Sequence, residues 1–341
     1  MNFFKKRIPI IYTLLLAIIC SGLSFILFKK LTTSSAIATE QYPPSANGSN
    51  CDLSISRLKG YMYIQPLIAV SKECEAQDLV ALKNDITNLI ENEKKAGVII
   101  NASVFIKEFS NAHWTSVNSE ETYLPGSLFK LPVMFTILRM GENDPSFLNK
   151  KILYNPQGVV NIKQTYESKT IRPGQSYTVK ELLTYMIAYS DNNATQLLNR
   201  IMNPDMLIKV FADLGLTPPK PNMADYMAYT ISAHDYSIFM NALYNAAYLN
   251  INNSEFATSL LAQCNFKDGL VKGLPADVKI AHKFGEAGNA QFNELHETGI
   301  VYINNNTYLI TVMTKGNDVK KLAETISEIS RITYARMKQN A

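Results

Sequence analysis

The first pattern in this sequence that could do chemistry is a serine three residues before a lysine. In the stretch "YLPGSLFKLPVM", Ser127 and Lys130 follow a turn at Pro125 and Gly126 and open an apolar helix. Because positions i and i+3 share one face of a helix, the hydroxyl and the amine point the same way. The pair offers a nucleophile beside a base. The alternative reading is that Ser127 only caps the helix while Lys130 is solvated.

This chemistry requires a neutral lysine. Ser127 is a weak nucleophile at its free pKa, so a neighbouring group must take its proton as it attacks a carbonyl. Lys130 can do so only as the neutral amine, and the ordinary pKa of lysine is about 10.4. Desolvation and a second cation such as Lys283 would lower that pKa. The backbone N–H of Ser127, at a helix N-terminus, also provides one donor for the developing oxyanion.

Two later groups of residues strengthen the first. "YSDNNA" contains Ser190 to Asn192 between apolar helical turns, and "HKFGEAG" contains Lys283 to Gly285 on a predicted strand. Singly, the first is a common helix cap and the second an edge lysine. Their order along the chain, Ser-x-x-Lys, then Ser-Asp-Asn, then Lys-x-Gly, resembles that of class A β-lactamases and penicillin-binding proteins. The resemblance extends from about Gly97 to the C-terminus.

The resemblance implies further roles for these residues. Ser190, assisted by Lys283, would return a proton to the leaving nitrogen. Asn192 would hold the substrate amide and orient Lys130. It also implies no cofactor, and the cysteines show no metal-ligand spacing.

The strand of the third motif would bind substrate. By the same resemblance, the second oxyanion donor is the backbone N–H of Glu286, next to Gly285.

The chain departs from the family pattern at three places. The stretch "GLTPPKPNMADYMAYT" lacks the glutamate that activates the deacylating water in class A β-lactamases, and Asp225 is its only acid. Phe284 replaces the usual Thr or Ser, so it cannot hydrogen-bond a substrate carboxylate. The strand "NELHETGIVY" contains no arginine for that carboxylate. These departures remove binding and deacylation groups but leave the nucleophile in place.

Two hypotheses from different classes follow. The first is a serine acyl hydrolase that forms an acyl-enzyme at Ser127 with β-lactams or the D-alanyl peptides of peptidoglycan, as a β-lactamase or as a penicillin-binding D,D-peptidase. The second is a non-catalytic module that binds cell-wall peptide or a partner, which Phe284 favours. A Ser-His pair through His282 or His296 is disfavoured, because His282 and Lys283 point to opposite faces of their strand.

The elements that must position these residues can be predicted from periodicity. Helical spacing predicts a first helix over Glu75–Lys95, and alternating apolar residues predict a hairpin of Val98–Phe109 with His113–Val117. Helical patterns continue over about 143–264, strongest at Val179–Met202, Pro204–Leu214, Ser232–Tyr248 and Ser254–Cys264. Strands return at Lys279–Gly288, His296–Ile303 and Thr307–Thr314, before a last helix at Val319–Lys338.

Strands at both ends of the chain, with helices between and after them, indicate an α/β (α+β) sandwich. It consists of one antiparallel sheet with helices on both faces and an inserted all-helical subdomain. We therefore divide the chain into a cytoplasmic tail (1–7), a membrane anchor (8–28), a linker (29–50), a lead-in segment with the first helix (51–96) and a β-lactamase-like domain (97–341).

The N-terminus predicts where the protein acts. The uncharged run 8–28 is long enough to cross a bilayer, which favours a single-pass anchor with the catalytic domain outside the membrane. Secretion after signal cleavage near "AIA" at 36–38 is the alternative. Residues 1–30 carry five basic and no acidic groups, which leaves 28 basic and 29 acidic residues beyond them. The near-neutral remainder argues against nucleic acid as a partner. Oligomeric state is not predicted.

The spacing of two cysteines would permit a disulfide bond in an oxidising compartment. Cys51 and Cys74 bracket one short segment and could pair there, whereas Cys264 is isolated and Cys20 lies in the predicted anchor.

Overall fold

The computed structural model describes residues 38–41, 53–57, 67–72, 74–156, 165–166, 168–220, 228–304 and 306–339. The predicted tail and anchor, most of the predicted linker, Cys51 and Asp225 lie outside these residues. Within them, no helix is both long enough and apolar enough to cross a bilayer. Cys74 is disulfide-bonded and Cys264 is a free, buried thiol.

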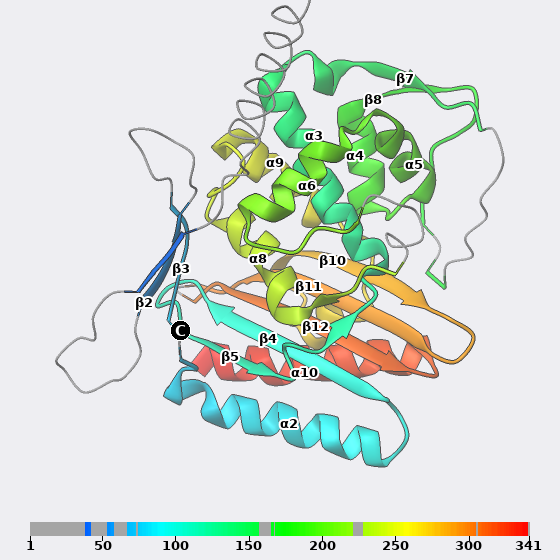
Figure 1. The fold of residues 1–341 in the computed structure, drawn as a ribbon. Helices are drawn as coiled ribbons and strands as arrows, with labels where there is room; N and C mark the ends of the chain where they lie inside the picture. The colour runs from blue at the N-terminus through cyan, green and yellow to red at the C-terminus, as the bar shows by residue number, and fades with distance from the viewer. Residues whose placement is uncertain are drawn as a thin grey trace, which may run out of the picture.

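A five-stranded antiparallel sheet forms the centre of the fold, with strand order β10-β11-β12-β4-β5 (Figure 1). Its strands are β4 (Asn101–Glu108), β5 (Trp114–Val117), β10 (Lys279–Gly288), β11 (Asn293–Tyr302) and β12 (Tyr308–Gly316). β4, β11 and β12 are buried at nearly every position. Both faces of the sheet must therefore be covered by helices, as the predicted sandwich requires.

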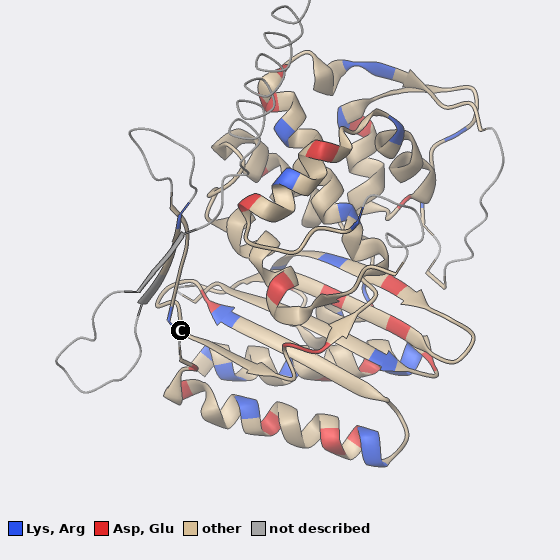
Figure 2. Cartoon of the chain, in the orientation of Figure 1, with Lys and Arg blue, Asp and Glu red and all other residues tan. Residues whose placement is uncertain are grey.

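One face of the sheet carries the helices from the two ends of the domain. These are α2 (Val80–Lys95), preceded by η1 (Gln77–Leu79), and α10 (Val319–Gln339). Both lie below the sheet in Figure 1, and α10 packs on β11, β12 and α2. α2 carries both basic and acidic residues (Figure 2), while its buried side is made of Leu82, Ile86 and Ile90. This spacing is the amphipathic pattern from which the helix was predicted.

The other face carries the helical subdomain. α8 (Ala233–Tyr244) packs directly on β4, β11 and β12, and the remaining helices build outward from it. They are α3 (Lys130–Asn143), α4 (Val179–Ala188), α5 (Asn192–Ile201), α6 (Pro204–Asp213) and α9 (Ile251–Leu261). Ten of the fourteen residues of α3 are buried, because other helices surround it. The predicted inserted helical subdomain is therefore confirmed.

The helical segment predicted over Val179–Met202 is two helices. Thr178 caps α4, with its hydroxyl accepting from the Glu181 N–H at 3.1 Å. The helix ends at Ala188, because Ser190 has a positive φ of 52° that no helix continues through. Asp191 then caps α5 by accepting from the Asn193 N–H at 2.9 Å. The break sets the second motif on a loop between two helices.

The residues before α2 form a second sheet that was not predicted. β1 (Ala38–Gln41), β2 (Leu53–Arg57) and β3 (Leu67–Lys72) pair antiparallel. β1 falls inside the segment 29–50 that was predicted as a linker, where no strand was expected. The four residues of β1 form a strand because they pair with β2, and the local sequence does not predict that pairing.

Short elements complete the fold. Two small sheets pair β6 (Thr122–Tyr123) with β9 (Ile231–Ser232) and β7 (Lys151–Leu153) with β8 (Ser176–Thr178). Short 3₁₀ helices are η2 (Gly126–Phe129), η3 (Phe147–Asn149) and η4 (Leu270–Gly273).

Candidate active site

The turn that carries Ser127 is pressed against the strand that carries Lys283. Ser127 lies in η2, and Lys130 is the first residue of α3. A Cβ added to Gly126 would lie 2.3 Å from the Glu286 carbonyl oxygen, and one added to Gly285 would lie 2.5 Å from the Pro125 carbonyl oxygen. Such contacts leave no room for a side chain at either position. Two glycines therefore bring the backbone of Glu286 beside that of Ser127.

Side chains from two other elements hold this turn. The Tyr236 hydroxyl, on α8, donates to the Leu128 carbonyl at 2.8 Å. His296, on β11, accepts at Nδ1 from the Thr314 N–H at 3.2 Å, so its Nε2 carries the proton and donates to the Leu124 carbonyl at 3.0 Å. His296 therefore positions the turn as a neutral side chain, with both ring nitrogens occupied. The sequence contained no signal for either role.

Lys130 points at the second motif. The residue is 4% exposed, and its Nζ donates to the Ser190 carbonyl at 2.5 Å, to Ser190 Oγ at 3.1 Å and to Asn192 Oδ1 at 2.8 Å. These three bonds use all three protons of an ammonium group. A neutral Lys130 would keep two of them and gain a lone pair that can accept a proton.

Ser190 Oγ lies between two amines. Lys283 Nζ donates to it at 3.0 Å, and Lys130 Nζ lies 3.1 Å away. The Lys283 amine also donates to the Phe284 carbonyl at 2.8 Å. The hydroxyl can therefore pass a proton between the two lysines, or from either of them to a group bound beside it.

Burial prepares both lysines for proton transfer. Desolvation lowers the pKa of Lys130 well below its usual value, the positive charge of Lys283 lowers it further, and Asp191 opposes the shift. Desolvation also lowers the pKa of Lys283 to about 8, against the influence of Cys264 and Glu297. Both causes were expected for Lys130 from the sequence. Cys264 is a neighbour of the site that the sequence did not indicate.

Asp191 has a structural position. Its carboxylate accepts from the Thr170 hydroxyl, the Ile171 N–H and the Asn193 N–H, each at 2.9 Å. These bonds tie the segment at 170–171 to the start of α5 and leave Asp191 occupied. The carboxylate thus supports the loop that presents Ser190 and Asn192.

Ser127 is half-buried. Among the described residues, no hydrogen bond of the Ser127 hydroxyl is found. The three hydrogen bonds of the Lys130 amine all go to acceptors on the second motif. The structure thus brings Lys130, Ser190, Asn192 and Lys283 into one cluster, with Ser127 one helical turn before Lys130. Asp225 lies outside the described residues.

Phe284 and His282, the neighbours of Lys283 on β10, contact residues outside the catalytic cluster. The Phe284 ring stacks on Phe266 with centroids 4.5 Å apart, and it is 4% exposed. His282 Nδ1 donates to Glu297 Oε1 at 2.6 Å, and Glu297 Oε2 accepts from the Leu270 N–H at 2.7 Å. His282 is therefore committed to a buried carboxylate. No contact of His282 or His296 in the described chain supports a Ser-His pair.

Glu286 makes a contact that the sequence did not indicate. Its carboxylate accepts from the Thr165 hydroxyl at 2.5 Å and from the Thr165 N–H at 3.1 Å. The adjacent Tyr166 ring meets Phe266 edge-on at 4.7 Å. These bonds hold Thr165 and Tyr166 against β10, next to the third motif.

Comparisons with known proteins agree with this architecture. The sequence model described as the beta-lactamase enzyme family matches residues 81–337. A PBP-A mutant solved as an acyl-enzyme with penicillin G is 20% identical, with a TM-score of 0.62 over 76% of this chain and 97% of that one. A beta-lactamase from Chitinophaga pinensis is 17% identical, with a TM-score of 0.65 over 75% of this chain and 98% of that one.

A class A beta-lactamase from Bacteroides cellulosilyticus is 19% identical, with a TM-score of 0.64 over 76% of this chain and 99% of that one. No curated protein sequence matches the chain. The family match begins at 81, so it includes α2 but none of β1 to β3.

Proposed function

Because the chain belongs to the beta-lactamase enzyme family, we propose that it is a serine acyl hydrolase that forms an acyl-enzyme at Ser127 with β-lactams or D-alanyl peptides. The observation that carries this proposal is the Ser190 hydroxyl held between the amines of Lys130 and Lys283. A fold without catalysis has no physical need for two buried lysines, whose desolvation costs several kcal/mol in order of magnitude.

Acylation follows from the positions of these groups. Neutral Lys130 takes the proton of Ser127 as Oγ attacks the carbonyl carbon of the amide. The carbonyl oxygen becomes negative between the N–H groups of Ser127 and Glu286. As the carbon–nitrogen bond breaks, the leaving nitrogen takes the proton of Ser190 Oγ, which Lys130 or Lys283 replaces. The products are an ester at Ser127 and an amine.

We further propose that this ester is long-lived. The stretch 215–230 contains no glutamate to activate a water molecule, and Asp225 is its only acid. An acyl-enzyme without a deacylating base persists until a slow hydrolysis or an acceptor amine removes the acyl group. This is the behaviour of a penicillin-binding peptidase. Asp225 as a replacement base is the alternative that would give a β-lactamase.

We place this activity outside the membrane. The apolar run 8–28 supports an anchor, and the disulfide at Cys74 supports an oxidising compartment. The substrates that the proposal names, cell-wall peptides and the drugs that mimic them, are found in that compartment.

Intact-mass spectrometry of the full chain with penicillin G tests the proposal. We expect an adduct of one ring-opened drug that is absent from the Ser127→Ala variant. An adduct that persists for hours indicates a penicillin-binding peptidase, while a transient adduct with consumption of the drug indicates a β-lactamase. An adduct that forms equally on Ser127→Ala would overturn the assignment of the nucleophile.

A second candidate is a non-catalytic peptide-binding module, which Phe284 favours. Its ring is stacked on Phe266, so this position of the third motif offers no hydroxyl to a substrate carboxylate. No adduct at any time, with a folded chain that binds a D-alanyl-D-alanine peptide reversibly, would select this function instead.

A further inference from the structure

A cavity lies away from the active site, where the N-terminal sheet meets the catalytic domain. It has a volume of about 420 Å³ and is partly open to solvent. Its walls come from β2 and β3, from β4 and β5, and from α8. None of the proposed catalytic residues lines it. Its volume falls in the range of pockets that hold small ligands.

The floor of this cavity is aromatic. The Phe105 and Trp114 rings stack with centroids 5.8 Å apart, and His234 meets Phe105 edge-on at 5.3 Å. Ile68 and Ile238 add apolar surface on the two walls. Such a surface favours a ligand with an apolar body.

A buried cation stands at this floor. Lys107 is 6% exposed, and its Nζ donates to the Val70 carbonyl at 3.0 Å and to Ser71 Oγ at 3.2 Å. Both acceptors are neutral, and an ammonium group carries a third proton. Desolvation lowers the pKa of Lys107 to about 8, which leaves it charged at neutral pH.

The other charges around the cavity have the same sign. Its described lining contains Lys72, Lys107 and His234 but no acidic residue. The acids nearest to His234 are Asp235, at 3.3 Å, and Glu120, at 3.9 Å, and neither of them lines the cavity. A buried cation without a carboxylate partner is costly, and an anion placed beside it would offset that cost.

One wall of the cavity lies outside the part of the chain that the family shares. The match begins at 81, whereas β3 contributes Ile68, Ala69, Ser71 and Lys72. Trp114 fixes that wall, because its Nε1 donates to the Lys72 carbonyl at 2.7 Å. The cavity is therefore built by the N-terminal sheet together with the catalytic domain.

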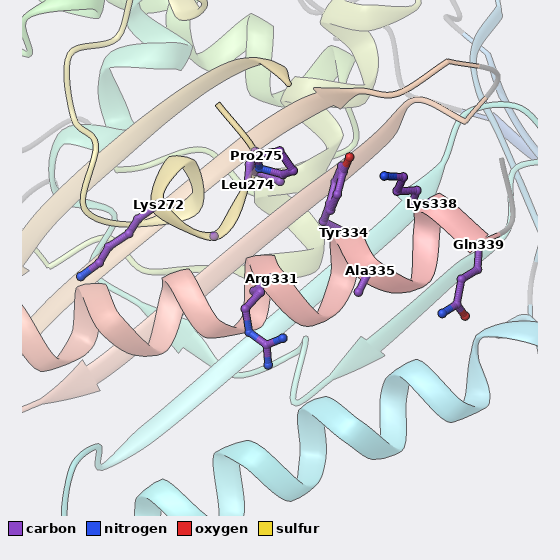
Figure 3. Close-up of a pocket in the computed structure, with 9 residues that line it drawn as sticks. Lys272, Leu274, Pro275, Arg331, Tyr334, Ala335, Lys338 and Gln339 are labelled. Carbon is purple, nitrogen blue, oxygen red and sulfur yellow. The ribbon is translucent and has the colours of Figure 1, made fainter. Parts of the chain in front are cut away.

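We propose that this cavity is a binding site for a small organic carboxylate, with its apolar body against Phe105 and Trp114 and its carboxylate at Lys107. A groove beside α10 differs from this cavity, because its basic residues are not buried. Its basic residues are Arg331 and Lys338 on α10 and Lys272 on η4, and all three are exposed (Figure 3). Arg331 is already paired with Glu328 there.

The chain offers a direct probe, because Trp114 is its only tryptophan. Fluorescence of the full chain would be titrated with cyclohexanecarboxylate and, separately, with the neutral cyclohexanecarboxamide. We expect a saturable change with the carboxylate and an affinity at least about tenfold lower for the carboxamide, since a charge-assisted bond is lost. Equal titrations, or no saturable change with the carboxylate, would overturn the proposal.

Two variants locate the cation. Lys107→Met should weaken carboxylate binding by about tenfold or more, and His234→Gln by a smaller factor, while the exposed control Lys279→Met should titrate as the unmodified chain does. Circular dichroism establishes that each variant is folded. If Lys107→Met does not fold, the proposal is still tested by the ratio of the affinities for the carboxylate and the carboxamide, and by the affinity of His234→Gln. Binding that neither substitution weakens would refute the site.

Discussion

His282 and Lys283 are neighbours on β10, both buried and both basic, yet their hydrogen-bond partners give one a structural role and the other a transferable proton. His282 is paired with the Glu297 carboxylate, which a backbone N–H of Leu270 also holds. Lys283 has a hydroxyl, a carbonyl and the face of the Phe284 ring as partners, and its charge acts on the nearby Lys130. A carboxylate partner makes a buried base structural, whereas a hydroxyl shared with a second amine leaves its proton transferable.

The largest expected effect tests the reactive side of this comparison. Lys130→Met should lower the rate of acylation by penicillin by roughly 10³-fold, because it removes the amine that we propose takes the proton of Ser127. Stopped-flow or quenched-flow mass spectrometry measures this rate. Stability should fall by only about 1–2 kcal/mol, since the acceptors on Ser190 and Asn192 lose a donor while a desolvated amine is removed.

A urea denaturation curve provides the control for Lys130→Met. A large loss of stability would mean that Lys130 is mainly a structural tie for Ser190. A rate within threefold of the unmodified chain would remove it as the base.

The structural side of the comparison predicts the opposite pattern. His282→Ala should lower the free energy of unfolding by about 3 kcal/mol, because it leaves the buried Glu297 carboxylate without its side-chain partner. Acylation by the folded fraction should be unchanged. Urea titration and intact-mass kinetics on the same preparation measure both quantities. Abolished acylation in a folded variant would instead revive the Ser-His hypothesis.

A smaller effect concerns pH. The pKa of Lys283 lies at about 8, below the ordinary 10.5, so this lysine loses its charge as the pH rises through 8. If its proton serves the leaving nitrogen, the acylation rate should fall about tenfold per pH unit above that value. Deprotonation of Lys130, whose pKa is also lowered, sets the rising limb at lower pH.

Lys283→Arg is the matched control for the pH profile. Arginine stays charged throughout this range, so the decline above pH 8 should disappear, even if the absolute rate is lower. A decline that survives in this variant must belong to another group, and Lys283 would then have no part in the proton transfer.

Much of the fold could be predicted because its signals are local. The strand Lys279–Gly288 was predicted with the bounds that the structure shows, since it lies between turn residues and has strand-forming composition. The last helix was predicted within one residue from its apolar spacing. By contrast, the pairing of β1 to β3 into a sheet was not predicted, and the break at Ser190 depends on a backbone conformation that helix propensity does not reveal.

The sequence by itself determined which groups are present and how each is spaced within its own element. Ser127 and Lys130 had to share a helix face, and His282 and Lys283 had to point to opposite sides of a strand. Only the tertiary structure decided that Lys130 and Lys283 meet at one hydroxyl, that Phe284 stacks in a core, and that a sheet outside the shared domain encloses Lys107. The reason is physical: the pKa of a lysine and the partners of a buried group depend on desolvation and on contacts between segments far apart in the chain.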